Sequence, residues 1–297
     1  MGKRSIRRSL LYVPGSSNKM LDKAVVVPAD GVILDLEDSV SISEKIAARA
    51  RVLAYIPKIR QAGNKEILVR VNGMDTLWGI EDLLTVLPSC PDTVVIPKAN
   101  ERALVIADGI ISAVETQQNL QPNSIGMVAL FESAYSIANP LPILTVAARI
   151  TGVQLGGEDL TKEQGIQRTL QGEEIRYARQ QVAMAGRACG LDILDTPYTG
   201  IHDLEGLRQD TETAKQIGFT GKTCIHPSHL ATINKIFSPS EEDVAFAKAL
   251  LEVYDAAVAD GRGACMYQNK MIDAPVADRA RKLLQKAEQI EKIGFVS

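Results

Sequence analysis

The sequence contains few cysteines and no closely spaced pair of them. Its four cysteines stand at positions 90, 189, 224 and 265, without a C-x-x-C motif. Disulfide frameworks and structural zinc sites need more numerous or closer cysteines, so this pattern argues against both. The sequence therefore predicts a cytoplasmic protein whose thiols are reduced and mostly buried.

Long apolar runs and a one-sided charge are also missing. No run approaches the ~18 residues of a membrane span. The apolar segment 10–14 is too short for a signal peptide, so we expect neither a leader nor a membrane. The 33 basic and 36 acidic residues give a net charge of −3. This balance leaves no electrostatic footprint for nucleic acid.

Several familiar motifs fail on inspection. Gly221-Lys222-Thr223 resembles the end of a phosphate-binding loop, but that motif needs a glycine where the chain has Gln216. His226 and His229 have the spacing of helical zinc ligands, but such a pair without a third ligand is more often structural. No nucleophile elbow, dinucleotide-binding glycine fingerprint or H-E-x-x-H motif is present.

Eight short apolar segments alternate with segments of helical pattern. The expected strands are 9–13, 31–38, 66–72, 93–98, 126–131, 150–155, 192–195 and 221–225. The expected helices are 43–62, 79–87, 101–116, 171–190, 203–217, 240–261 and 276–292. Such alternation is typical of a parallel sheet, and eight units predict a (β/α)₈ TIM barrel. We expect the barrel over 1–237 and a C-terminal helical extension over 238–297. The extension could be a solvated tail, a packing appendage or a lid.

Polar residues gather at the carboxyl ends of these strands. They are Pro14, Glu37, Arg70, Lys98, Glu132, Asp159, Asp195 and His226. Active sites of barrel enzymes are built at this face. A single such residue could cap a helix, whereas eight together are hard to explain by capping.

Two of these residues, Glu132 and Asp159, end neighbouring buried strands. Carboxylates at the same ends of adjacent strands can converge on a hard cation such as Mg²⁺, which binds few protein oxygens and several waters. The alternative is that Glu132 caps the next turn and Asp159 the next helix. These two segments alone do not decide between the alternatives.

With the strand ends identified, the sequence resembles the citrate lyase β-subunit-like group of the HpcH/HpaI aldolase/citrate lyase family, which includes malyl-CoA and citramalyl-CoA lyases. The matching motifs are Arg8-Ser-Leu-Leu-Tyr-Val-Pro14-Gly15, Asp35-Leu-Glu37-Asp38-Ser39-Val40, Arg70-Val-Asn72, Pro97-Lys98, Glu132-Ser133, Gly156-Gly-Glu158-Asp159-Leu160, Gly218-Phe-Thr-Gly-Lys222, Ile225-His-Pro227 and Lys270-Met-Ile-Asp273-Ala-Pro275-Val. They cover nearly the whole chain in order.

The resemblance implies a Mg²⁺-dependent barrel enzyme that cleaves or forms a C–C bond beside a thioester. Glu132 and Asp159 match the family's protein ligands to Mg²⁺. Arg70 matches the arginine that holds the developing oxyanion, and Glu37 and Asp38 match acids that support metal-bound waters.

The resemblance also assigns a role to the C-terminal extension. Asp273 matches an aspartate that acts as general acid or base and is often delivered by a neighbouring subunit. The family usually forms trimers or hexamers, which predicts a homo-oligomer.

The sites that bind the thioester are less defined. The basic residues Arg7, Arg8 and Lys19 could meet the phosphates of coenzyme A, and a solvated surface explains each equally well. From the matched motifs, Pro97, Lys98, Gly157 and Glu158 are further candidates for substrate or coenzyme A binding.

A competing mechanism would use a lysine Schiff base, for which Lys98 and Lys222 stand at suitable strand ends. The several acids that converge at the same face favour metal chemistry instead.

The leading hypothesis is a lyase that splits a 3-hydroxy dicarboxylyl-CoA, with citramalyl-CoA giving acetyl-CoA and pyruvate as first choice. The alternatives are malyl-CoA cleavage and a citrate lyase β subunit acting on citryl-acyl-carrier protein. The segment 161–174 is unlike the longer, arginine-bearing loop associated with citrate lyase β subunits, which favours a coenzyme A substrate. A non-catalytic barrel that binds a thioester or carrier protein is the hypothesis from another class.

Overall fold

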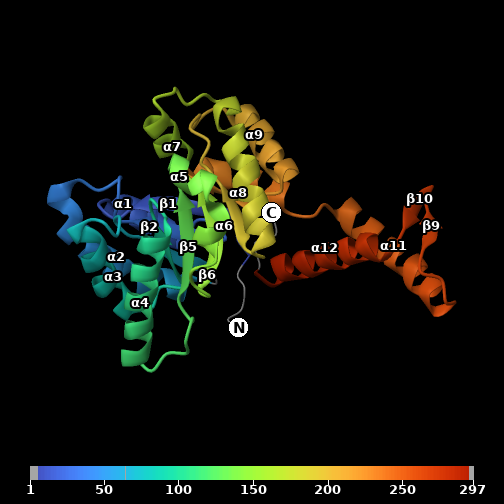
Figure 1. Ribbon diagram of the computed structural model, residues 1–297, viewed down its shortest axis with the longest axis horizontal. Helices are drawn as coiled ribbons and strands as arrows, with labels where there is room; N and C mark the ends of the chain where they lie inside the picture. Colours follow the sequence, from blue (N-terminus) through green and yellow to red (C-terminus); the bar gives the residue numbers. More distant parts are fainter. Residues whose placement is uncertain (1–5, 64, 294–297) are drawn as a thin grey trace. The chain divides into compact units, whose positions relative to one another are not determined.

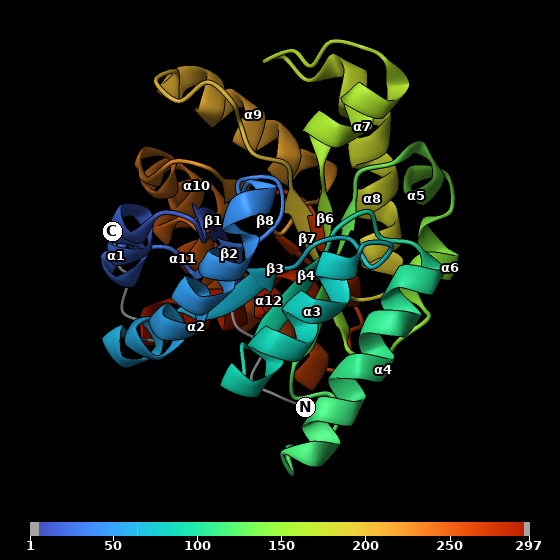
Figure 2. The same ribbon diagram turned by 90° about the vertical axis from the view of Figure 1, so that its left-hand side faces the viewer.

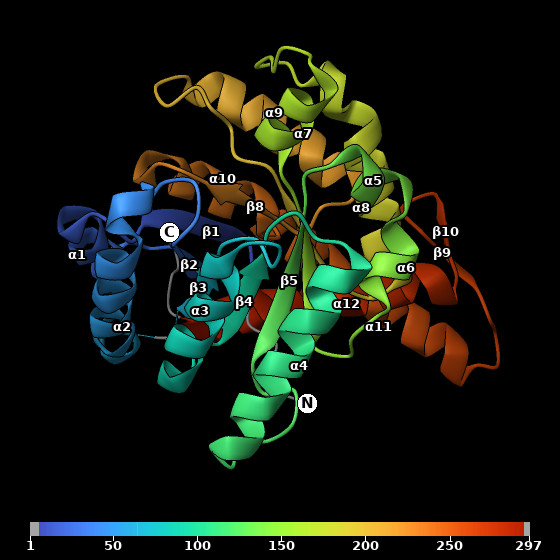
Figure 3. The ribbon, with the colours of Figure 1, turned by 60° about the vertical axis from the view of Figure 1, so that its left-hand side comes forward.

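The computed structural model describes residues 6–63 and 65–293. The chain divides into two compact units, the first ending at Asn234 and the second beginning at Lys235. In the first unit eight parallel strands close into a barrel, with β1 pairing with both β2 and β8. Helices surround these strands (Figures 2 and 3). The (β/α)₈ barrel expected from the sequence is confirmed.

The barrel strands are short and almost wholly buried. They are β1 (Ser9–Pro14), β2 (Gly31–Asp35), β3 (Glu66–Arg70), β4 (Thr93–Ile96), β5 (Gly126–Phe131), β6 (Ile150–Leu155), β7 (Asp192–Asp195) and β8 (Gly221–Cys224). Four of them end earlier than expected, at Asp35, Arg70, Ile96 and Cys224. The polar residues that follow them therefore lie in loops, where backbone and side chains are free to turn toward a common site.

The helices of the first unit are α1 (Asn18–Val26), α2 (Lys45–Ala62), α3 (Leu77–Val86), α4 (Glu101–Gln117), α5 (Ala134–Ala138), α6 (Pro140–Leu144), α7 (Gly157–Gln164), α8 (Arg176–Ala188) and α9 (Leu204–Ile217); α10 (Leu230–Phe237) spans the boundary between the units. Five short helices, α1, α5, α6, α7 and α10, were not among the expected helices. The long helix expected from 171 begins only at Arg176, after a 3₁₀ turn, Glu173–Ile175.

The barrel interior is apolar in the middle and charged at its amino-terminal end. Seven buried side chains form the central layers, namely Leu10, Ile33, Leu68, Val95, Val128, Leu130 and Leu194. Below them Arg7 is 7% exposed and donates to Glu66 Oε1 (2.7 Å), Thr93 Oγ1 (3.2 Å) and Thr151 Oγ1 (3.0 Å). Arg7 therefore closes the end of the barrel opposite to the one where active sites are built.

The second unit is built around two long helices, α11 (Glu241–Ala259) and α12 (Ala274–Ile293), which pack against each other (Figure 1). Ser240 and Asp243 form a capping box that begins α11. The segment between the helices contains an antiparallel hairpin of β9 (Cys265–Tyr267) and β10 (Lys270–Ile272). Within the described residues, no helix is long and apolar enough to cross a membrane.

Candidate active site

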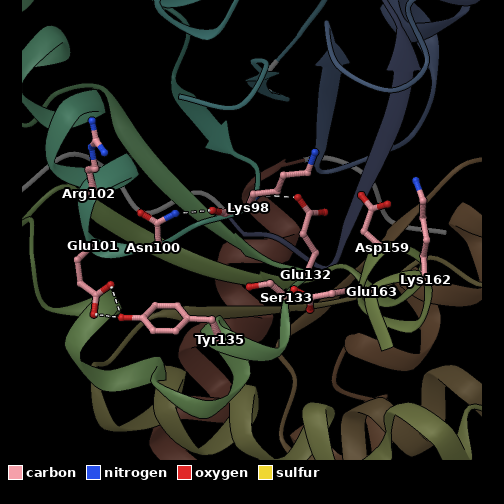
Figure 4. A pocket seen from close by; sticks show the side chains of 10 residues that line it. All are labelled: Lys98, Asn100, Glu101, Arg102, Glu132, Ser133, Tyr135, Asp159, Lys162 and Glu163. Carbon is pink, nitrogen blue, oxygen red and sulfur yellow. Dashed lines mark hydrogen bonds between the residues drawn. The ribbon is translucent and has the colours of Figure 1, made fainter. Parts of the chain in front are cut away.

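A cleft of about 860 Å³ opens at the carboxyl end of the barrel, over the loops that follow β4, β5 and β6. Its lining residues are Lys98, Asn100, Glu101, Arg102, Glu132, Ser133, Tyr135, Asp159, Lys162 and Glu163. Figure 4 shows the carboxylates of Glu132 and Asp159 side by side, with the amino group of Lys98 near them. The structure thus brings together the two acids that the sequence analysis paired.

Glu132 directly follows β5 and is 5% exposed. Its Oε1 accepts the backbone N–H of Lys98 at 2.7 Å. Burial raises the pKa of this carboxyl to about 7, and the nearby negative charge of Asp159 adds to the effect, while the Lys98 hydrogen bond opposes it. A bound cation would stabilise the charged form of such a buried carboxylate more than that of an exposed one.

Asp159 lies in the first turn of α7, which begins directly after β6. The turn is anchored from the barrel side because the backbone N–H of Gly157 donates to Thr196 Oγ1 at 3.0 Å. Gly156 has no side chain to separate β6 from β5: a Cβ there would lie 2.7 Å from Glu132 Cβ. The glycine pair therefore allows the two acids to approach each other.

The side chain of Arg70, the last residue of β3, is held by contacts with three acidic side chains and one aromatic ring. Its Nε and Nη2 donate to Asp35 at 2.7 and 2.8 Å, and its Nη1 lies 2.9 Å from Glu37 Oε2 and 3.5 Å from Asp38 Oδ2. The guanidinium also stacks over the ring of Tyr12, 4.8 Å from its centroid. Burial acts to lower the pKa of Arg70, but its anionic neighbours raise it well above the usual value. Arg70 is a permanent, well-oriented cation.

Glu37 lies in the loop after β2 and is 5% exposed. Burial raises its pKa to about 8, against the opposing effect of Arg70. Its Oε2 lies 2.9 Å from Arg70 Nη1, but the two groups are not aligned for a hydrogen bond, and Oε2 has no hydrogen-bond partner. Lys45 Nζ holds the loop by donating to the carbonyls of Leu36 and Glu37, both at 2.7 Å. Glu37 can therefore keep a proton near neutral pH beside Arg70.

The site fits the Mg²⁺ expected from the sequence. Within residues 6–63 and 65–293, no group of three or more histidine, cysteine, aspartate or glutamate side chains is arranged to hold a metal. Two carboxylates that line an open cleft match the coordination of Mg²⁺, which keeps waters or substrate oxygens at its other positions. Glu132 and Asp159 would hold the ion, and the raised pKa of Glu132 marks a position where negative charge lacks compensation.

Comparison with known proteins agrees with this geometry. A family model described as HpcH/HpaI aldolase/citrate lyase matches residues 8–227. The chain belongs to this family. It is 34% identical to citrate lyase subunit beta of Escherichia coli strain K12 over 285 residues, which cover 95% of this chain and 93% of that protein.

Two further relatives of this family member carry other names or ligands. The (3S)-malyl-CoA thioesterase of Cereibacter sphaeroides (strain ATCC 17029) is 35% identical over 292 residues, 95% of each chain. A crystal structure of CitE from Mycobacterium tuberculosis in complex with magnesium, acetoacetate and coenzyme A matches with a TM-score of 0.76 and 28% identity, covering 94% of this chain and 97% of that one. The chain thus groups with citrate lyase β and CoA-ester lyase-like enzymes.

The remaining residues proposed to bind substrate or coenzyme A lie in different environments. Pro97 and Lys98 line a smaller cleft of about 370 Å³, which shares Lys98, Asn100 and Arg102 with the main one. Gly157 is buried, and Glu158 is exposed beside Arg168, 3.7 Å away. Lys19 is exposed on α1.

Arg8 and Asp273 are each engaged in contacts within their own unit. Arg8 is 2% exposed and pairs with Asp30 at 2.7 Å, just before β1 and β2 begin. The expectation that Arg8 meets a coenzyme A phosphate is therefore corrected, because its guanidinium is buried at the amino-terminal end of the barrel. Asp273 lies in the second unit, where its Oδ1 accepts the N–H of Val276 and caps the start of α12. Its catalytic role stays a prediction.

Sequence reasoning missed much of the cleft wall. Asn100, Glu101 and Arg102 begin α4, and Lys162 and Glu163 lie one turn beyond Asp159. The spacing of 159, 162 and 163 on one helical face was a usable signal. Tyr135, which donates to Glu101, offered none, because its helix α5 was not expected.

The structure disfavours both lysines proposed for Schiff-base chemistry. Lys222 is fully buried and donates to Asp195 at 2.5 Å and to the carbonyl of Thr196 at 2.7 Å. Burial acts to lower the pKa of Lys98, but Glu37, Glu132 and Asp159 raise it overall. Imine formation needs a neutral amine, which the acids around Lys98 disfavour. Lys222 has no exposed surface that a carbonyl substrate could reach.

We expect borohydride to trap no adduct when the protein is incubated with pyruvate or another 2-oxo acid. The reason is that Lys98 stays an ammonium ion and Lys222 is enclosed by ion pairs. Intact-protein mass spectrometry before and after reduction measures the outcome. A stable mass increase that maps to Lys98 or Lys222 would show that a Schiff base forms.

Proposed function

We propose that this protein is a Mg²⁺-dependent carbon–carbon lyase that cleaves a 3-hydroxy dicarboxylyl-CoA thioester by retro-Claisen chemistry. The first-choice reaction converts citramalyl-CoA to acetyl-CoA and pyruvate, with malyl-CoA as an alternative substrate. The observation that carries the proposal is the placement of Glu132 and Asp159 in one cleft, with Arg70, which is 12% exposed and paired with Asp35, close enough for its charge to act on Glu132.

In this reaction the substrate's hydroxyl loses its proton, the adjacent C–C bond breaks, and the acetyl thioester leaves as an enolate that takes up a proton. Mg²⁺, when bound, would lower the pKa of the hydroxyl and polarise the forming carbonyl. Glu132 and Asp159 would hold the ion. The guanidinium of Arg70, fixed by Asp35, would stabilise the oxygen on which negative charge develops.

Other residues would handle protons and orientation. Glu37, protonated near neutrality, can hold a proton beside Arg70, and the exposed Asp38 can orient water at the cleft. Asp273 would exchange the proton of the enolate from the C-terminal unit, in a homotrimer or homohexamer in which a neighbouring subunit delivers it. Lys19, Pro97, Lys98, Gly157 and Glu158 are proposed as substrate or coenzyme A contacts.

A second candidate is the β subunit of a citrate lyase, cleaving citryl-acyl-carrier protein to oxaloacetate and an acetyl thioester. It is favoured by the 34% identity to the Escherichia coli subunit across nearly the whole chain. The loop 165–172 also carries Arg168, which donates to Glu174 at 2.6 Å, so this segment does contain an ordered arginine. A non-catalytic thioester-binding barrel has less support, because the acids of the cleft are complete.

We expect acetyl-CoA release from citramalyl-CoA with Mg²⁺. EDTA should abolish this release, because the proposed reaction depends on an ion held by Glu132 and Asp159 to polarise the substrate. The measurement is chromatographic detection of acetyl-CoA from citramalyl-CoA, malyl-CoA and citryl thioesters. Free coenzyme A is followed too, since one relative is named a malyl-CoA thioesterase. Turnover of only citryl-acyl-carrier protein would support the second candidate, and EDTA-resistant cleavage would contradict the metal mechanism.

A further inference from the structure

The turn that joins β4 to α4 has an unusual backbone. Lys98 has φ = +47°, in the left-handed region that residues with a Cβ rarely occupy. The other such residues in the barrel unit's described part are Cys90, Asn119 and Asn123. Asparagine tolerates this conformation because its short polar side chain can hydrogen-bond to the nearby backbone, which the long lysine side chain does not do. A conformation of this kind persists only where surrounding contacts enforce it.

The contacts that enforce it lead to Glu132. The backbone N–H of Lys98 donates to Glu132 Oε1 at 2.7 Å, and the next N–H, of Ala99, donates to the carbonyl of Leu130 at 3.1 Å. Asn100 locks the other side of the turn: its Oδ1 accepts from Ala103 N at 3.0 Å and its Nδ2 donates to Lys98 O at 3.1 Å. The turn is therefore bonded to the end of β5 and to the start of α4.

Glu132 is confined from its other side as well. A Cβ at position 156 would lie 2.9 Å from Glu132 Oε2, so only glycine leaves room for the carboxylate where it stands. The Lys98 side chain contributes less to this confinement. It is 57% exposed, and its Nζ lies 4.0 Å from Glu37, at the outer limit of an ion pair.

We propose that Lys98 is a positioning residue for the metal site, and that it acts through its left-handed backbone rather than through its ammonium group. The turn presents one N–H to Glu132 Oε1 and so fixes the carboxylate before Mg²⁺ arrives. The inference rests on the metal site of the proposed function. It concerns binding of the ion and needs no particular substrate.

Substitutions at one position separate the backbone from the side chain. Lys98→Gly and Lys98→Asn remove the ammonium but readily adopt positive φ, whereas Lys98→Val removes it and disfavours positive φ. We expect the glycine and asparagine variants to bind Mg²⁺ within about threefold of the wild type. The valine variant should bind about tenfold or more weakly, the usual effect of losing an outer-shell partner of a metal ligand.

The readout is the Mg²⁺ dissociation constant from isothermal titration calorimetry of the whole chain, with thermal unfolding measured alongside. Asn119→Val is the matched control, because Asn119 also has positive φ (54°) but is exposed, and its backbone N–H donates to Thr116 O at the end of α4. It should lose stability and keep its Mg²⁺ affinity. Alanine disfavours positive φ less strongly than valine, so Lys98→Ala should have an intermediate Mg²⁺ affinity. This variant replaces Lys98→Val if the valine variant does not fold.

Equal weakening in all Lys98 variants would assign the effect to the ammonium and overturn the inference. An unchanged dissociation constant in the folded valine or alanine variant would overturn it too, as would a wild type that binds no Mg²⁺. Thioester turnover is not part of this measurement. A wild type that binds Mg²⁺ but cleaves none of the thioesters would refute the lyase proposal and leave the Lys98 result to stand on its own.

Discussion

Replacing Glu132 by glutamine is expected to lower the turnover of the thioester substrate by about a thousandfold or more. A metal-polarised oxygen supplies several kcal/mol of transition-state stabilisation, and each ~1.4 kcal/mol corresponds to a tenfold change in rate. Glutamine keeps the size of the side chain and an oxygen that can accept the Lys98 N–H, but it removes the negative charge that would hold Mg²⁺. The loss should therefore appear in both kcat and Mg²⁺ affinity.

The same substitution should not destabilise the fold. The pKa of Glu132 is raised to about 7, chiefly by burial, so the folded protein holds a proton there that the unfolded chain releases at lower pH. Stability therefore falls as pH rises from the unfolded value toward 7, and above that pH the buried charge opposes folding. Glutamine carries no such charge. At pH 8 in the absence of Mg²⁺, we expect a Tm equal to or above that of the wild type.

Glu115→Gln is the matched control, because Glu115 is buried to a similar degree but far from the cleft. It is 2% exposed and accepts hydrogen bonds from Arg149 Nη1 at 3.0 Å. Burial acts to raise its pKa, yet Arg149 and backbone donors lower it overall, so its charge stabilises the fold. This variant should lose stability and keep activity. Substantial activity in Glu132→Gln, or a clear fall in its Tm at pH 8, would contradict our account.

The barrel could be predicted because eight short apolar runs alternate with segments of helical pattern. Val128, Ala129 and Leu130 are apolar at consecutive positions, which is typical of a strand buried on both faces of a parallel sheet. Short helices were not predicted, because they contain too few residues to show a helical pattern. Helix α7 is eight residues long and starts at Gly157, a residue that by itself indicates a loop. The hairpin of β9 and β10 turns through Gln268 and Asn269, of which only the second is a common turn residue.

The site could be predicted in part, for a related reason. Polar residues at strand ends identify the face, so Glu132, Asp159 and Arg70 could be placed there from their positions, whereas the roles predicted for them came from the family resemblance. Their partners depend on the course of loops, which the sequence does not reveal. Nothing in the residue order shows that the N–H of Lys98 reaches Glu132. The same holds for Arg8: a basic residue near the N-terminus suggested an exposed anion site, whereas Asp30 pairs with it in the interior.

Replacing Asp195 by alanine is expected to destabilise the barrel unit by about 3–5 kcal/mol, the usual effect of removing one partner from a buried ion-pair network. Asp195 is fully buried at the end of β7. It accepts from Arg179 Nε and Nη2, both at 3.0 Å, and from Lys222 Nζ at 2.5 Å. Without it, two buried cations would share the single carboxylate of Asp210.

The measurement is denaturant unfolding, with Glu205→Gln on α9 as the control. Glu205 pairs with Arg208 at 2.7 Å but its side chain is 64% exposed, so its loss should leave the unfolding midpoint unchanged. Burial acts to raise the pKa of Asp195, but Arg179 and Lys222 lower it overall. Its contribution is therefore complete above the unfolded pKa of about 4 and lost as pH falls below it. A difference between wild type and variant that grows in acid would contradict the assignment.

This network also accounts for the position of a fully buried lysine within β8. Lys222 Nζ donates to the carbonyl of Thr196 at 2.7 Å, and Thr196 Oγ1 accepts the N–H of Gly157 at the start of α7. The same turn of α7 carries Asp159. Loss of Asp195 should therefore weaken Mg²⁺ binding as well as the fold. Asp195→Asn keeps an acceptor for Arg179, so we expect its Mg²⁺ affinity to fall less than that of Asp195→Ala. The reason is that the contacts that anchor the start of α7 should be disturbed less.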